Sequence, residues 1–244
     1  MPELPAAARL VVWGNACLAG AASPDEAAER VTGPSDATHR VFGLPGEDGG
    51  VSMTYALARL RPLGVTSLRL ALPRPGDVSG LPGPPAFNRR ALATGAAALA
   101  AGTSPLGLLD ESRGAWTVHP VQPDPRPPTP LNEADRDLQR VMRSATARLV
   151  HLDVARWQPA AAEVLAHQAA QSTRSPLPRS SPPQSAHLLD TALRLLTIVD
   201  VARADDGAAV SASEMAARRE ALREVETAAR HAVEAACNAG SPQV

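Results

Sequence analysis

The chain of 244 residues contains no lysine, because all 24 of its basic side chains are arginines. Without lysine there is no Schiff-base chemistry, no P-loop lysine and no kinase-type strand lysine. Abundant alanine, arginine and proline without lysine is typical of a high-GC coding bias, so a single arginine is weak evidence for guanidinium chemistry. The 24 basic residues balance 25 acidic ones, which argues against a general nucleic-acid or membrane-surface role.

Aromatic side chains are also scarce, with three tryptophans, one tyrosine and two phenylalanines. They provide no stacking platform for single-stranded nucleic acid. No apolar run approaches the roughly 20 residues of a membrane span, so we expect neither a nucleic-acid partner nor a membrane partner. The apolar segment Leu10–Ala22 has Glu3 before it and no basic residue until Arg9. This pattern is unlike a secretory signal and favours a cytoplasmic location.

Signs of metal, redox or nucleophilic chemistry are missing as well. Cys17 and Cys237 have no metal-ligand spacing, and we expect two buried free thiols, with a long-range disulfide left open. No ligand spacing links the six histidines, which are residues 39, 119, 151, 167, 187 and 231. His151 and Asp153 point about 200° apart on a helix. There is no GxSxG motif. We therefore expect no metal and no cofactor, and the catalytic residues, if any, are unknown.

Two proline-rich stretches organise the chain, one over residues 120–130 and one over 172–185. Period-two runs precede the first stretch, and helical spacing follows it. The predicted fold is α+β or α/β, with a small N-terminal mixed α/β domain followed by an antiparallel helical bundle. The predicted boundaries are 1–122 for the first domain, 123–130 for a Pro-rich connector and 131–240 for the bundle, with a mobile loop at 172–185.

Within the first domain, the pattern predicts helices at 4–20, 24–31, 51–61 and 85–95. It predicts strands at 39–43, 65–72, 106–110 and 116–119, with a hairpin turn at 111–114. Residues 96–101 fit either a small-residue strand or a helix tail. The Gly-rich segment 43–50 is interpreted as a turn, since Glu47 and Asp48 would repel phosphate.

In the second half, apolar residues recur in steps of four and three. The first series is Leu138, Met142, Ala145, Leu149 and Leu152, and Pro159 then starts another helix. A second series from Leu188 to Ala202 has a wider apolar face, which predicts a central helix. Ser211–Glu214 is a capping box for a last helix that ends near Cys237. The charge ladder Glu226, Arg230 and Glu234 on that helix is interpreted as a solvated face. Trp157 is predicted to fill the junction between domains or helices.

The most informative loop connects the 65–72 strand to the 85–95 helix. Ligands in α/β folds bind at such strand ends, and a helix N-terminus with nearby arginines suits an anion or a carboxylate. The candidate ligand-binding residues are Arg74, Asp77, Asn88, Arg89 and Arg90. In the alternative interpretation the loop is a rigid crossover, and Gly76, Gly80 and Gly83 set its backbone angles.

The segments 68–88 and 152–157 resemble a group of uncharacterised proteins from high-GC actinobacteria. The resemblance implies a bacterial cytoplasmic setting and implies no activity. The sequence as a whole favours a non-catalytic cytoplasmic protein that binds a protein partner or a small ligand. The alternative is an enzyme that acts on a small anionic substrate at the 73–90 loop.

Overall fold

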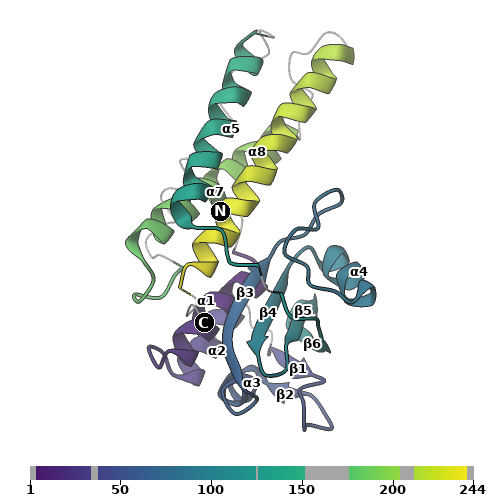
Figure 1. Ribbon diagram of the computed structural model, residues 1–244, viewed down its shortest axis with the longest axis vertical. Helices are drawn as coiled ribbons and strands as arrows, with labels where there is room; N and C mark the ends of the chain where they lie inside the picture. The colour runs from purple at the N-terminus through teal and green to yellow at the C-terminus, as the bar shows by residue number, and fades with distance from the viewer. Residues whose placement is uncertain (1–3, 34–37, 125, 152–175, 204–211, 241–244) are drawn as a thin grey trace. The chain divides into compact units, whose positions relative to one another are not determined.

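The computed structural model describes residues 4–33, 38–124, 126–151, 176–203 and 212–240 (Figure 1). Their contacts form two compact units, each described by itself below. The α/β unit comprises the described residues up to 128, together with 176–182 and 237–240. The helical unit comprises 129–151, 183–203 and 212–236. No helix within the described ranges is long and apolar enough to cross a membrane.

The α/β unit contains a mixed six-stranded sheet. Its helices are α1 (Ala6–Leu18), α2 (Pro24–Thr32), α3 (Met53–Leu60) and α4 (Pro85–Thr94). Its strands are β1 (Arg40–Phe42), β2 (Val51–Ser52), β3 (Val65–Ala71), β4 (Ala97–Gly102), β5 (Leu106–Ser112) and β6 (Ala115–Pro120). The strand order is β2-β1-β6-β5-β4-β3, and all pairs are antiparallel except the parallel β1–β6 pair.

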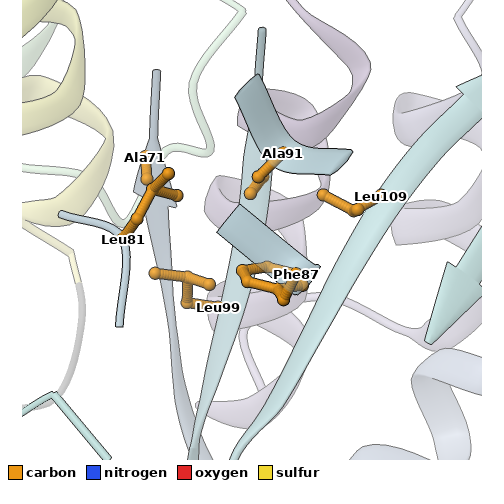
Figure 2. Close-up of a cluster of buried hydrophobic side chains, with 7 residues drawn as sticks. Ala71, Leu81, Phe87, Ala91, Leu99 and Leu109 are labelled. Carbon is orange, nitrogen blue, oxygen red and sulfur yellow. The ribbon is translucent and has the colours of Figure 1, made fainter. Parts of the chain in front are cut away.

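Helices cover both faces of this sheet. Alternate residues of β3 point to opposite faces, so Leu68 faces α1 while Ala71 faces α4. Figure 2 shows Phe87 and Ala91 of α4 against the sheet residues of the second face. On the first face, α1 approaches closely because Gly14 has no side chain; a Cβ there would stand 2.3 Å from a Leu68 methyl group. The unit is therefore a three-layer arrangement, with α1–α3 on one face and α4 on the other.

The outer edge of β3 is occupied by side-chain amides. Asn15 of α1 accepts a hydrogen bond from the Leu68 N–H at 2.7 Å and donates one to the Leu68 carbonyl at 2.8 Å. Asn238 makes the same pair of bonds with Leu70, at 2.7 and 3.2 Å. Both asparagines are buried. Each amide thus replaces one residue of a neighbouring strand, which satisfies the backbone groups of an edge that would otherwise offer itself for pairing.

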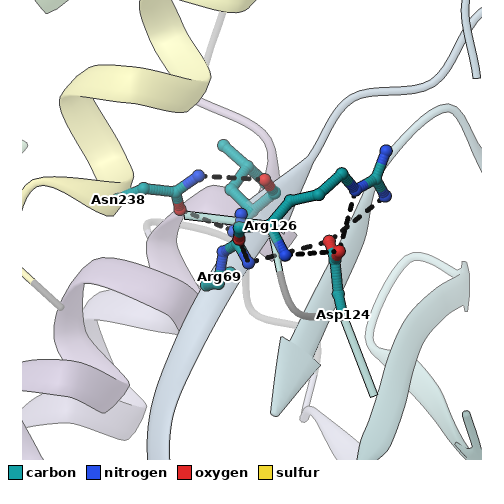
Figure 3. Close-up of polar contacts among 5 residues, drawn as sticks. Arg69, Asp124, Arg126 and Asn238 are labelled. Carbon is teal, nitrogen blue, oxygen red and sulfur yellow. Dashed lines mark hydrogen bonds and ion pairs between the residues drawn. The ribbon is translucent and has the colours of Figure 1, made fainter. Parts of the chain in front are cut away.

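The first residues of the connector are held at the same strand (Figure 3). Arg69 donates to the Arg126 carbonyl at 2.7 Å, and the Arg126 Nε donates to Asp124 at 2.8 Å. Burial raises the pKa of Asp124, but the hydrogen bonds and charge of Arg126 and the charge of Arg69 outweigh it and hold that pKa below its usual value. The connector therefore starts from a fixed point on β3.

The helical unit consists of α5 (Leu131–His151), α7 (Pro183–Arg203) and α8 (Ala212–Asn238), whose last two residues belong to the α/β unit. Helix α7 has one wide buried face, formed by residues that include Leu188, Leu189, Ala192, Leu193 and Val199. This agrees with the wide apolar face seen in the sequence, and the central position of the helix stays a prediction. Ion pairs also link the helices: Glu224 of α8 binds Arg148 of α5, and Glu226 of α8 binds Arg203 of α7.

The predicted fold class is confirmed as α+β, with every described strand before residue 121 and every described element after 130 helical. Residues 97–102 form a strand, which decides between the two alternatives for that segment. Residues 51–52 form the short strand β2, so the helix predicted from residue 51 starts at Met53. No disulfide joins Cys17 and Cys237; Cys237 is buried as predicted, whereas Cys17 is only half-buried. The interpretation of the charge ladder as solvated is wrong at Arg230, which is only 5% exposed.

Part of the second proline-rich stretch packs in the α/β unit. Leu177 is buried, and the Trp13 indole N–H donates to the Pro176 carbonyl at 3.1 Å. Helix α7 already begins at Pro183. The mobility of 172–185 stays a prediction, and 172–175 lie outside the described residues. The predictions for Leu152, Trp157 and Pro159 also lie outside them.

Candidate functional site

The loop predicted to bind a ligand leaves β3 and enters α4, as the strand and helix patterns require. Arg74 and Asp77 close a tight turn, with their backbones bonded at 2.8 and 2.9 Å. The Asp77 carboxylate accepts hydrogen bonds from the backbone N–H and the hydroxyl of Ser79. Asp77 is thereby engaged in stabilising its own turn.

Two more candidate residues are held by contacts within the α/β unit. The Asn88 side-chain oxygen accepts a hydrogen bond from the Gly83 N–H at 3.0 Å, which ties the loop to the first turns of α4. The Arg90 Nε lies 3.2 Å from the Glu111 carboxylate of β5. These contacts use groups that a ligand would need.

The remaining candidates, Arg74 and Arg89, are exposed, and neither side chain has a hydrogen bond or ion pair with another described residue. The Arg74 guanidinium lies beside Gly95, at the C-terminal end of α4, whereas Arg89 belongs to the N-terminal half of that helix. The structure therefore brings Asn88 to Gly83 and Arg90 to Glu111, and it directs Arg74 toward the far end of α4. Ligand binding at this loop stays a prediction.

The backbone of the loop supports the rigid-crossover alternative. Gly76, Gly80 and Gly83 have φ values of +86°, +81° and +93°. Side chains other than glycine are strained in this left-handed region. The glycines thus have a conformational reason to be present that requires no ligand.

A second candidate site lies in the helical unit, where the end of α7 meets the start of α8. A cavity of about 320 Å³ is lined by Ala202, Arg203, Met215, Arg218, Arg219, Leu222 and Arg223. We call it the arginine cavity. Its α8 residues are spaced by three, one, three and one positions, which places them along one face of the helix. One face of this helix therefore combines three arginines with two apolar residues.

The four guanidinium groups of the arginine cavity have different partners. Arg203 pairs with Glu226 at 2.6 Å, and Arg223 holds both oxygens of Glu220, at 2.6 and 2.9 Å. The hydrogen bond from Arg223 holds the pKa of Glu220 below its usual value. Arg218 donates to the Ala202 carbonyl at 2.8 Å. Arg219 is exposed and has no hydrogen bond or ion pair with another residue of the described ranges.

A larger cavity, of about 470 Å³, lies where α5 and α7 begin. It is lined by Leu131, Asn132, Asp135, Pro183, Gln184, His187 and Leu188. The polar groups here are two amides, an imidazole and one carboxylate, and that carboxylate already accepts a hydrogen bond from Gln139 at 2.9 Å. This mixture of groups points to no particular ligand chemistry.

The buried histidine of the α/β unit has a structural role. The Trp116 indole N–H donates to His39 Nδ1 at 3.2 Å, so this nitrogen is an unprotonated acceptor. Burial lowers the pKa of His39. Across the described ranges, no three His, Cys, Asp or Glu side chains are grouped so that they could hold a metal ion.

Two family models match the chain. The Rv1486c-like protein N-terminal domain covers residues 7–131, and the Rv1486c-like protein C-terminal domain covers residues 132–234. The chain belongs to the Rv1486c-like protein family. Rv1486c is a mycobacterial gene name, which agrees with the resemblance to actinobacterial proteins. No curated protein and no solved structure is significantly similar to the chain.

The two models of the Rv1486c-like family meet at the start of α5, so the loop and the arginine cavity fall in different family domains. Sequence reasoning singled out the loop and missed the cavity. The available signal was the spacing of Met215, Arg218, Arg219, Leu222 and Arg223 on one helix face. This spacing does not stand out, because arginine is the only strongly basic residue of the chain and is common on helix surfaces.

Proposed function

We propose that this chain is a non-catalytic cytoplasmic protein that binds a small anionic ligand in the arginine cavity. The observation that supports it is a cavity of about 320 Å³ whose lining includes four arginines. Each guanidinium has five N–H donors in a planar fork that matches carboxylate and phosphate oxygens. The ion pairs with Glu220 and Glu226 use only some of these donors, so the others can face a ligand.

The existing ion pairs are weak enough to be rearranged. The side chains of Arg203 and Arg223 are 41% and 63% exposed, and exposed ion pairs contribute only about 0–1 kcal/mol. A ligand that is held by several arginines at once can therefore compete with the glutamates. The side chains that line the cavity come from alanine, methionine, leucine and arginine, which include no nucleophile and no general base suited to neutral pH. This composition favours binding over catalysis.

The proposal is tested by isothermal titration calorimetry of the full chain at low salt, with inorganic phosphate, pyrophosphate and citrate as probes. We expect Arg219→Gln to weaken binding roughly tenfold or more, since a hydrogen bond to a charged group contributes about 1.5–3 kcal/mol. Arg194→Gln is the matched control, because Arg194 is an exposed arginine of α7 that pairs with Asp190 at 2.8 Å outside the cavity. The proposal fails if wild type binds none of the three probes, or if both variants weaken binding equally.

A further inference from the structure

The apolar part of the arginine cavity bears on the kind of anion that fits. Ala202, Met215 and Leu222 share the lining with the arginines. Met215 is half-buried, and Leu222 is only 7% exposed. Inorganic anions gain nothing from contact with such groups, because the hydrophobic contribution scales with the apolar area that two partners remove from water. The lining is therefore better suited to a ligand that has an apolar part of its own.

The order of residues along α8 places the apolar and cationic groups side by side. Met215 lies four residues before Arg219, and Leu222 lies three residues after it, so both are neighbours of that arginine on the helix surface. A ligand whose acidic group contacts Arg219 would therefore have apolar side chains on either side of it. The volume of about 320 Å³ lies at the lower end of the roughly 300–1,000 Å³ typical of small-molecule sites. A phosphate ion would leave most of this space to water.

Building on the proposed function, we infer that the ligand is a small organic anion, with a phosphate or carboxylate group joined to a short apolar body. The acidic group contacts the arginines, with Arg219 as its main anchor. The apolar body lies against Met215 and Leu222. Selectivity for organic over inorganic anions then comes from these two apolar side chains, while the arginines supply affinity for both kinds.

The test compares matched pairs of probes by isothermal titration calorimetry on the full chain. Phenyl phosphate is compared with inorganic phosphate, and phenylacetate with acetate, so that the preferred acidic group is identified as well. We expect at least one phenyl compound to bind roughly tenfold or more tightly than its small counterpart, as burial of an aromatic ring predicts. Met215→Ala should reduce the ratio between the affinity for the phenyl compound and that for its small counterpart about threefold or more.

The possible outcomes separate the two hypotheses. If inorganic phosphate and acetate bind as tightly as the phenyl compounds, the organic-anion inference is overturned and the anion-binding function stands. Met215→Ala and Met215→Gln are first shown by circular dichroism to be folded. The inference is also overturned if both variants leave the ratio of the affinity for the phenyl compound to that for its small counterpart unchanged. If none of the four probes binds, the organic-anion inference is overturned, and the binding of pyrophosphate or citrate decides whether the anion-binding function stands.

Discussion

Replacing Asn15 should show how strongly the side-chain amides stabilise the edge of the sheet. Asn15 is 3% exposed and bonds both backbone groups of Leu68, at 2.7 and 2.8 Å. In Asn15→Ala, the Leu68 N–H and carbonyl lose these partners inside the protein. A buried polar group without its partner costs about 1–3 kcal/mol. Two such groups predict a loss of about 2–6 kcal/mol in the free energy of unfolding, a large fraction of the roughly 5–15 kcal/mol typical of a folded protein.

Asn15→Leu separates hydrogen bonding from packing. Leucine has the same number and branching of side-chain heavy atoms as asparagine but cannot bond the Leu68 backbone, so it leaves no large cavity and still removes both hydrogen bonds. We expect it to destabilise the protein nearly as much as alanine does. Urea-induced unfolding, followed by circular dichroism and tryptophan fluorescence, measures both variants. If Asn15→Leu is within about 0.5 kcal/mol of wild type, the strand edge does not depend on the amide and the argument is refuted.

Three further predictions follow from the other sites. Glu226→Gln removes a carboxylate that pairs with an arginine of the cavity, so affinity for phosphate should rise in calorimetry; an unchanged or lower affinity would contradict this. Because burial lowers the pKa of His39, its contribution to stability is fully present above its unfolded pKa of about 6.5 and is lost as the pH falls through the lower folded value. His39→Gln should therefore flatten the decline in unfolding free energy between about pH 7 and 5. An unaltered decline would show that His39 does not cause this pH dependence. At the loop, Arg74→Ala and Arg89→Ala should each cost less than about 1 kcal/mol, whereas Gly83→Ala should lower the thermal midpoint; if the loop binds a ligand, the arginine variants also abolish the ligand-induced thermal shift.

Much of the α/β unit follows from local patterns. The start of α2 is an example, since the Ser23 hydroxyl accepts the Glu26 N–H at 3.1 Å and the helix begins at Pro24, as the sequence predicts. Strand β4 could not be predicted with the same certainty. Its run of small residues lacks clear alternation, and alanine favours helix. Pairing with β3 and β5 makes it a strand, and those partners are set by the tertiary fold.

The candidate site shows the same limit at the level of side chains. Sequence spacing named Arg90 and Asn88 as possible ligand contacts, but their partners, Glu111 and Gly83, become apparent only in the folded unit. The partner of Asn15 is more remote, because Leu68 lies 53 positions further along the chain. Residue type predicts which groups can bind something, whereas the fold decides which of them are already satisfied.

This distinction matters most in a chain whose only strong cation is arginine. Arg140 and Arg194 pair with acidic residues three and four positions away, and such local pairs form on a single helix without any help from tertiary structure. Arg203 and Arg219 differ, because they reach one cavity from the end of one helix and the beginning of another. Spacing along one helix explains the ion pairs of Arg140 and Arg194. It does not explain why Arg203 and Arg219 line the same cavity. Comparing Arg219→Gln with Arg194→Gln therefore tests the position of an arginine, with its chemistry held constant.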